Sequence, residues 1–226
     1  MSQSSLRHPL ARVLLVLTFT TGLVDAVSYL GLGHVFTANM TGNVVFLGFG
    51  IAGGTGLPVV APIVSLVAFL IGAAAGSALA TRMEERDPDH LTRALGIETA
   101  LVAVAAAVAI AVDVDPGRLS GYVVIALLAL AMGSRNATVR RLGVPDLTTT
   151  VLTMTLTGLA ADSPVTGGSG KGSVRRTAAV VAMFCGALAG ALLLKTSLVL
   201  PLVAASGLAL ATWLIYGART PRSAGT

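Results

Sequence analysis

The chain has 226 residues, of which 54% are hydrophobic and only 11% charged, and its mean hydropathy is +0.86. Soluble domains carry about 25% charged residues, so this composition excludes an ordinary soluble enzyme and predicts an integral membrane protein with the lipid bilayer as its surroundings. The formal net charge of +5 does not indicate a nucleic-acid-binding protein, because the basic residues lie between apolar segments and not in one stripe.

Six apolar segments are long enough to cross a hydrocarbon core of about 30 Å, which takes about 20 helical residues. In chain order they cover residues 10–31, 57–81, 94–112, 119–137, 176–195 and 197–217. Two further segments, 35–52 and 147–161, are apolar but short, and each begins with polar residues. These two segments either cross the membrane or enter it and leave on the same side.

The distribution of Lys and Arg separates these two topologies, because basic residues accumulate in short cytoplasmic loops. If all eight segments cross, eight of the fifteen Lys and Arg residues are cytoplasmic, which is no bias. If the two short segments are re-entrant, thirteen are cytoplasmic and only Arg118 and Lys195 lie outside. We therefore predict an all-α polytopic membrane protein with six transmembrane helices, two short re-entrant or broken helices, and both termini on the cytoplasmic side of the inner (cytoplasmic) membrane.

The two halves of the chain resemble each other. The stretch 67–76 reads closely like 181–190, and Gly22, Asp25 and Ala26 match Gly133, Asn136 and Ala137 at a slightly smaller spacing. Each half then contains three spans and one short segment, and an odd number of spans turns the second copy upside down. The sequence predicts a single transmembrane domain, 1–226, built from two inverted 3+3 repeats, 10–112 and 119–217. Chance similarity between Ala/Gly-rich helices is the alternative.

Asp25 is an ionisable residue inside the first predicted span. Such a residue costs about 2.5–3.5 kcal/mol at the centre of a membrane helix, so it should face the protein interior or a water-filled cavity. Intramembrane acids often mark ion or substrate pathways, and a protonatable Asp25 would couple transport to protons. Alternatively, Asp25 accepts hydrogen bonds from Asn39, Asn43 or a backbone N–H and holds its helix in place.

The short segments begin with polar residues that are typical of helix starts. In the first, Thr41 is the expected N-cap, with Asn39, Gly42 and Asn43 beside it. Threonines 148–150 open the second segment. Two half-helices that start inside the membrane would aim their N–H groups at the midplane, where a polar or anionic group could bind. The same side chains could instead satisfy backbone groups freed by the break.

The candidate substrate-binding residues combine these features from both halves. They are Asp25, Asn39, Thr41, Gly42, Asn43, Asn136, Thr149 and Thr150.

Two charged residues near predicted span ends have a simpler interpretation. Arg135, at the end of the fourth span, could pair with Asp25 or bind a carboxylate, but snorkelling to the interface beside Arg140 and Arg141 is favoured. Glu98 lies near a predicted helix start, where a carboxylate suits the helix dipole, so we expect it at the interface.

Two pairs of glycines spaced by four residues, Gly72 with Gly76 and Gly186 with Gly190, are typical of close helix packing. They would either form a homodimer contact or pack the two repeats together within one chain. Enzyme chemistry has little support. No histidine pair has metal-ligand spacing, Cys185 is the only cysteine, and the stretch 168–173 departs from a phosphate-binding loop at two positions. We expect no metal and no cofactor.

The residues from Gly22 to Gly48, with Val24-Asp25-Ala26 and Met40-Thr41-Gly42-Asn43, resemble the signature of the YoaK-like family of bacterial membrane proteins, described as domain of unknown function 1275. This resemblance extends over nearly the whole chain in length and span layout. It implies a small multi-span protein of the bacterial cytoplasmic membrane, without an established substrate, cofactor or catalytic residue.

The sequence thus predicts a permease for a small-molecule solute, with a polar site at the midplane between two inverted repeats that rock against each other. A passive channel for a small neutral or anionic solute is the first alternative. A membrane subunit that binds or assembles with a partner, without transport, is the second.

Overall fold

The computed structural model describes residues 9–218 except 55, 82–87, 143–151 and 171. The described residues form eight α-helices and one 3₁₀ turn, and they contain no strand. The six long helices are α1 (Pro9–Gly31), α3 (Val60–Thr81), α4 (Pro88–Ala111), α5 (Leu119–Leu142), α7 (Ser173–Leu194) and α8 (Val199–Gly217). The short elements are α2 (Met40–Ile51), α6 (Leu152–Ala161) and η1 (Pro164–Thr166).

All six long helices are long and apolar enough to cross a membrane. The most buried of them, α1 and α5, lie at the centre of the bundle, whereas α3 and α7 expose large apolar side chains. Leu70 on α3 and Phe184 on α7, for example, are each 65% exposed. Faces of this kind suit lipid and not water, so the all-α, multi-pass membrane architecture is confirmed.

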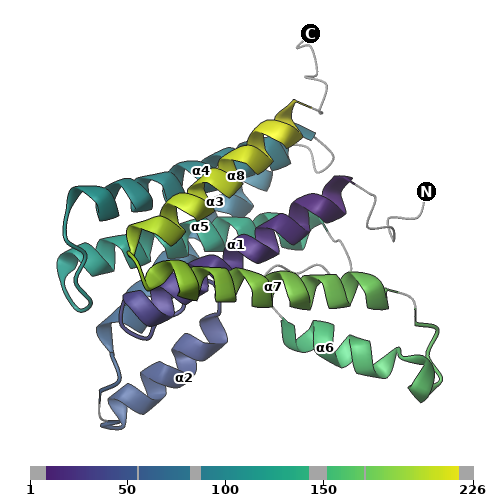
Figure 1. Cartoon of the computed structure of the whole chain (residues 1–226), viewed down its shortest axis with the longest axis horizontal. Helices are drawn as coiled ribbons and strands as arrows, with labels where there is room; N and C mark the ends of the chain where they lie inside the picture. Colours follow the sequence, from purple (N-terminus) through teal and green to yellow (C-terminus); the bar gives the residue numbers. More distant parts are fainter. Residues whose placement is uncertain (1–8, 55, 82–87, 143–151, 171, 219–226) are drawn as a thin grey trace.

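The spans alternate in direction. At one end of the bundle, Leu14 of α1 packs in an apolar cluster with Leu91 of α4, Val139 of α5 and Trp213 of α8. We call this the terminal end, because α1 starts there and α8 finishes there (Figure 1). A larger cluster, with residues such as Leu32, holds the other end, which we call the opposite end.

Four glycines bring helices from different halves of the chain into backbone contact. A Cβ atom on Gly22 of α1 would overlap the carbonyl oxygen of Met183 of α7, and one on Gly186 of α7 would overlap that of Phe19 of α1. The α1–α7 pair is therefore one tightly packed unit.

The second unit is the α3–α5 pair, and it is built in the same way. A Cβ atom on Gly72 of α3 would overlap the carbonyl oxygen of Leu130, and one on Gly133 of α5 would overlap that of Phe69. Among the helix contacts, these two pairs are the most extensive. The glycine motifs thus pack the two halves together within one chain, as one of the two sequence alternatives proposed.

The two short helices lie at one side of the bundle. At 12 and 10 residues, α2 and α6 are about 18 and 15 Å long, too short to cross a hydrocarbon core of about 30 Å. Helix α2 packs on α3 and α6 packs on α7. Each starts near the middle of the bundle and runs outward, α2 toward the opposite end and α6 toward the terminal end (Figure 1).

Candidate functional site

A cavity of about 410 Å³ lies where the two short helices begin. Its lining comes from the start of α2, the start of α6 and the middle of α7: Asn39, Thr41, Gly42, Val45, Leu152, Thr153 and Met183. Met183 is the eleventh of the 22 residues of α7, so the cavity lies at about mid-depth of that span. The two helix starts converge on it from opposite halves of the chain (Figure 1).

Of the predicted site residues that the structure describes, three line this cavity: Asn39, Thr41 and Gly42. The helix starts at Met40, so Asn39 and not Thr41 is the N-cap, and its side chain makes no capping hydrogen bond. The side chains of Asn39 and Thr41 are exposed. Since the first N–H groups of a helix have no partner within the helix, the start of α2 presents several donors at this point.

Asp25 does not line the cavity. The residue is 6% exposed, and Oδ1 accepts hydrogen bonds from the backbone N–H groups of Thr37 and Ala38 at 3.2 and 3.0 Å. The geometry therefore matches the alternative in which Asp25 holds backbone. It fixes the segment that returns from α1 to the start of α2.

Asn43 also binds this segment. Its Oδ1 accepts the N–H of Phe36 at 2.8 Å, and its Nδ2 donates to the Phe36 carbonyl at 2.6 Å. Ser65 of α3 donates to the same carbonyl at 2.7 Å, and the Phe36 ring stacks on Tyr29. Asn43 is completely buried, its amide bonds to the backbone at the turn before α2, and it is not among the described residues that line the cavity.

None of the site residues predicted in the second half is found among the described lining residues of the cavity. Asn136 donates from Nδ2 to the carbonyl of Met132 on its own helix, at 2.8 Å. Thr149 and Thr150 lie outside the described residues. Thr153, which is not among the predicted site residues, lines the cavity together with Leu152 and Met183.

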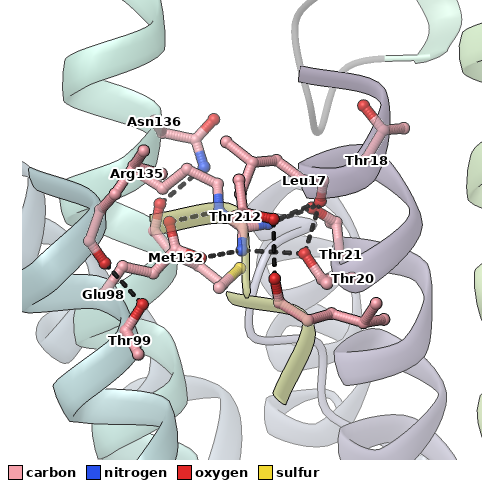
Figure 2. Close-up of polar contacts among 12 residues, drawn as sticks. Leu17, Thr18, Thr20, Thr21, Glu98, Thr99, Met132, Arg135, Asn136 and Thr212 are labelled. Atoms are coloured by element: carbon pink, nitrogen blue, oxygen red, sulfur yellow. Dashed lines mark hydrogen bonds and ion pairs between the residues drawn. The ribbon is translucent and has the colours of Figure 1, made fainter. Parts of the chain in front are cut away.

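A second polar cluster lies in the bundle interior, and both of its charged members were misplaced by the sequence analysis. Arg135 and Glu98, expected at the interface, have side chains that are each 2% exposed. They form a two-point ion pair, in which Nε of Arg135 donates to Oε2 of Glu98 at 2.9 Å and Nη2 donates to Oε1 (Figure 2). The pair is buried because both helices extend further than their apolar segments suggested.

The remaining donors of Arg135 all point to α1. Nη1 donates to the Leu17 carbonyl at 2.8 Å and to Oγ1 of Thr21 at 2.7 Å, while Nη2 donates to Oγ1 of Thr20 at 3.0 Å (Figure 2). A guanidinium has five N–H donors, and each makes a bond here. A space of only about 10 Å³ adjoins the cluster, which leaves no room for a solute.

Comparison with known proteins gives a family. The model described as "Protein of unknown function (DUF1275)" matches residues 13–215. The chain is 34% identical over 151 residues to "UPF0700 transmembrane protein YoaK" of Bacillus subtilis (strain 168). This alignment covers 66% of the chain and 65% of the length of that relative. No solved structure matches the chain.

Proposed function

The chain belongs to the DUF1275 family of multi-pass membrane proteins, and from this premise we propose that it is a permease for a small polar solute. The observation that carries the proposal is the cavity of about 410 Å³ at mid-depth, where α2 and α6 start. Most membrane-embedded backbone is fully bonded within helices. Half-helices that start at a shared cavity are the arrangement with which transporters bind solutes at the midplane.

The chemistry of the lining favours a neutral or anionic solute. The amide of Asn39 and the hydroxyls of Thr41 and Thr153 offer hydrogen bonds, and no ionisable side chain is among the described lining residues. Two helix starts add partial positive charge and N–H donors. A cation would meet no negatively charged side chain among the described lining residues.

The inverted repeat is part of the proposal, and the helix contacts support it. If the helices α1, α2 and α3 correspond to α5, α6 and α7, the contact of α1 with α7 corresponds to that of α5 with α3. In the same way, the packing of α2 on α3 corresponds to that of α6 on α7. Gly22 and Gly133 then occupy matching places, as do Gly72 and Gly186. The repeats are 10–112 and 119–217.

The close glycine contacts change which parts of the molecule would move. Because α1 is packed on α7 and α3 on α5, the two halves of the chain cannot rock as separate bodies without breaking backbone contacts. We propose instead that the α1–α7 pair moves against the α3–α5 pair. Each pair carries one short helix, so such a motion changes the cavity between them.

The orientation with both termini in the cytoplasm is also proposed. The positive-inside bias supports it, since exposed Arg12, Arg93 and Arg140 belong to the terminal end, whereas Arg118 and Lys195 belong to the opposite end. The inner membrane of a bacterium is the corresponding location.

Solute flux tests the proposal. Proteoliposomes that contain the purified protein are mixed with formate or glycerol, and swelling is followed by stopped-flow light scattering. We expect saturable, protein-dependent entry of at least one probe, reduced about five- to tenfold in Thr41→Val/Thr153→Val, which removes two hydroxyls from the cavity. The control Thr18→Val removes a hydroxyl whose one hydrogen bond among the described residues goes to the Leu14 carbonyl within α1. Protein-dependent flux of neither probe would contradict the proposal for these two solute classes.

A passive channel remains the second candidate, because converging half-helices also form the filters of channels. Entry that stays linear with concentration would favour the channel. A stoichiometric co-purifying partner, without any flux, would favour an assembly subunit. Proton coupling through Asp25 is tested by Asp25→Asn, since loss of uphill accumulation with retained exchange supports it and unchanged accumulation excludes it.

A further inference from the structure

We propose that Arg135 is a positioning residue that locks the α1–α7 pair to the α3–α5 pair and so sets the separation of the helix starts at the cavity. This inference rests on the proposed function, because it identifies what controls the proposed motion. The residues involved are Arg135 of α5, Glu98 of α4, and Leu17, Thr20 and Thr21 of α1.

The contacts of Arg135 lie at the boundary between the two pairs. The backbones of α1 and α5 come close at few positions, although both helices are central and their side chains share the two apolar clusters. Three hydrogen bonds from Arg135, to Leu17, Thr20 and Thr21, span that boundary at 2.7–3.0 Å. Arg135 is therefore the strong polar link between α5 and α1.

Glu98 fixes the guanidinium in the orientation that these bonds need. It accepts bonds from Nε and Nη2 and lies on α4, which packs on both α5 and α8; these two bonds tie Glu98 to Arg135 and so to α5. It also compensates a charge that would be very costly at this depth. The ion pair thus stays with α4 and α5, while the bonds to α1 are the ones that a relative motion must break.

The lock acts on the cavity through α1. Gly22, next to Thr21, is in backbone contact with Met183 of α7, which lines the cavity, and α7 carries α6. Three residues beyond Gly22, Asp25 holds the turn that leads into α2. Because α2 itself packs on α3, a shift of α1 away from Arg135 would move α6 together with α7 and pull on the turn that leads into α2.

Among the described residues, only the second half of the chain supplies such a polar link. Gly22 of α1 matches Gly133 of α5, so the counterpart of Arg135 in the first half is Val24. Val24 is 1% exposed and packs in the apolar cluster of the opposite end. An apolar contact has no directional bond to break, so the first half of the chain has no counterpart of this polar link at the matching position.

Distance measurement between the short helices tests the lock. Spin labels are placed at Thr41→Cys and Thr153→Cys in a Cys185→Ser background, and double electron–electron resonance gives the distribution of distances in lipid nanodiscs. The test variant adds Thr20→Val/Thr21→Val, which removes two acceptors of Arg135 and leaves its pair with Glu98 intact. The matched control adds Thr18→Val, on the same helix and without a bond to Arg135.

We expect a second distance population in the test variant, with about a tenfold rise in its ratio to the first population, and no change in the control. If the double variant does not fold, Thr20→Val alone removes one acceptor and should give a smaller rise in the same direction. A distribution equal to that of the control in a folded variant would overturn the lock, even if its thermal stability fell. The readout does not require solute flux, so the lock and the permease proposal fail separately.

Discussion

The cavity at the starts of α2 and α6 and the cluster around Arg135 both place polar groups at mid-depth, but they use these groups in opposite ways. Around Arg135, every guanidinium donor has an acceptor and both charges are 2% exposed. In the cavity, Asn39, Thr41 and Thr153 are exposed, and their side chains make no hydrogen bond to the described residues. Polar residues that hold the bundle together thus differ from those that the proposed permease would offer to its solute.

The largest loss of stability is expected from Glu98→Gln. This change leaves the buried Arg135 charge without its counter-ion, which costs about 3–5 kcal/mol. Thermal unfolding in detergent should show a large fall in the transition temperature. Asp115→Asn is the control, because its pair with Arg118, at 3.5 Å, is formed by side chains 53% and 78% exposed and contributes about 0–1 kcal/mol. Equal shifts for the two variants would mean that the buried pair does not hold the bundle.

Gly186→Ala is expected to cause the next largest loss of stability. The added Cβ would overlap the carbonyl of Phe19, so α1 and α7 must separate, at a cost of about 1–3 kcal/mol or more. On α8, Gly207→Ala meets open space and should be neutral or stabilise by about 0.5–1 kcal/mol. The same thermal assay compares them. Similar stability of both variants would contradict the close α1–α7 contact.

A smaller difference is expected between the two asparagines at α2. Asn43→Ala removes the two hydrogen bonds between the Asn43 amide and the Phe36 backbone. This loss should lower the free energy of unfolding by about 1–3 kcal/mol. Asn39→Ala, at an exposed cap without a side-chain bond, should stay within about 0.5 kcal/mol and act on flux instead. If Asn43→Ala lowered flux without loss of stability and Asn39→Ala lowered stability, the structural role of Asn43 and the solute-binding role of Asn39 would have to be exchanged.

The spans and the two short segments could be predicted from the sequence because apolar length and the polar starts are local features. The depth of Arg135 and Glu98 in the bundle could not be predicted, since it depends on where their helices begin and end. An α5 ending at residue 137 puts Arg135 at the interface, but the helix continues to Leu142, so Arg140 and Arg141 occupy its last turn. Likewise α4 starts at Pro88 and not at residue 94, which moves Glu98 from the first turn to the middle of the helix. Proline at the first helical position was the available signal.

The candidate site was only partly predictable, because polarity does not reveal direction. Asp25, Asn43 and Thr41 are all polar residues within one short stretch, yet the first two turn toward the backbone of residues 36–38 and the third lines the cavity. Which side chain serves the backbone depends on how the turn before α2 folds back on α1. This is a tertiary feature that no local pattern encodes.

The central claim is that α2 and α6 enter the membrane from opposite sides and meet inside it. It is tested most directly with single cysteines in a Cys185→Ser background, at Ala52 just after α2 and at Val165 just after α6, both exposed. An impermeant thiol reagent is applied to intact and then to permeabilised cells. The account predicts labelling of Ala52→Cys in intact cells and of Val165→Cys only after permeabilisation. Labelling of both positions from the same side would contradict it, because both short helices would then cross the membrane.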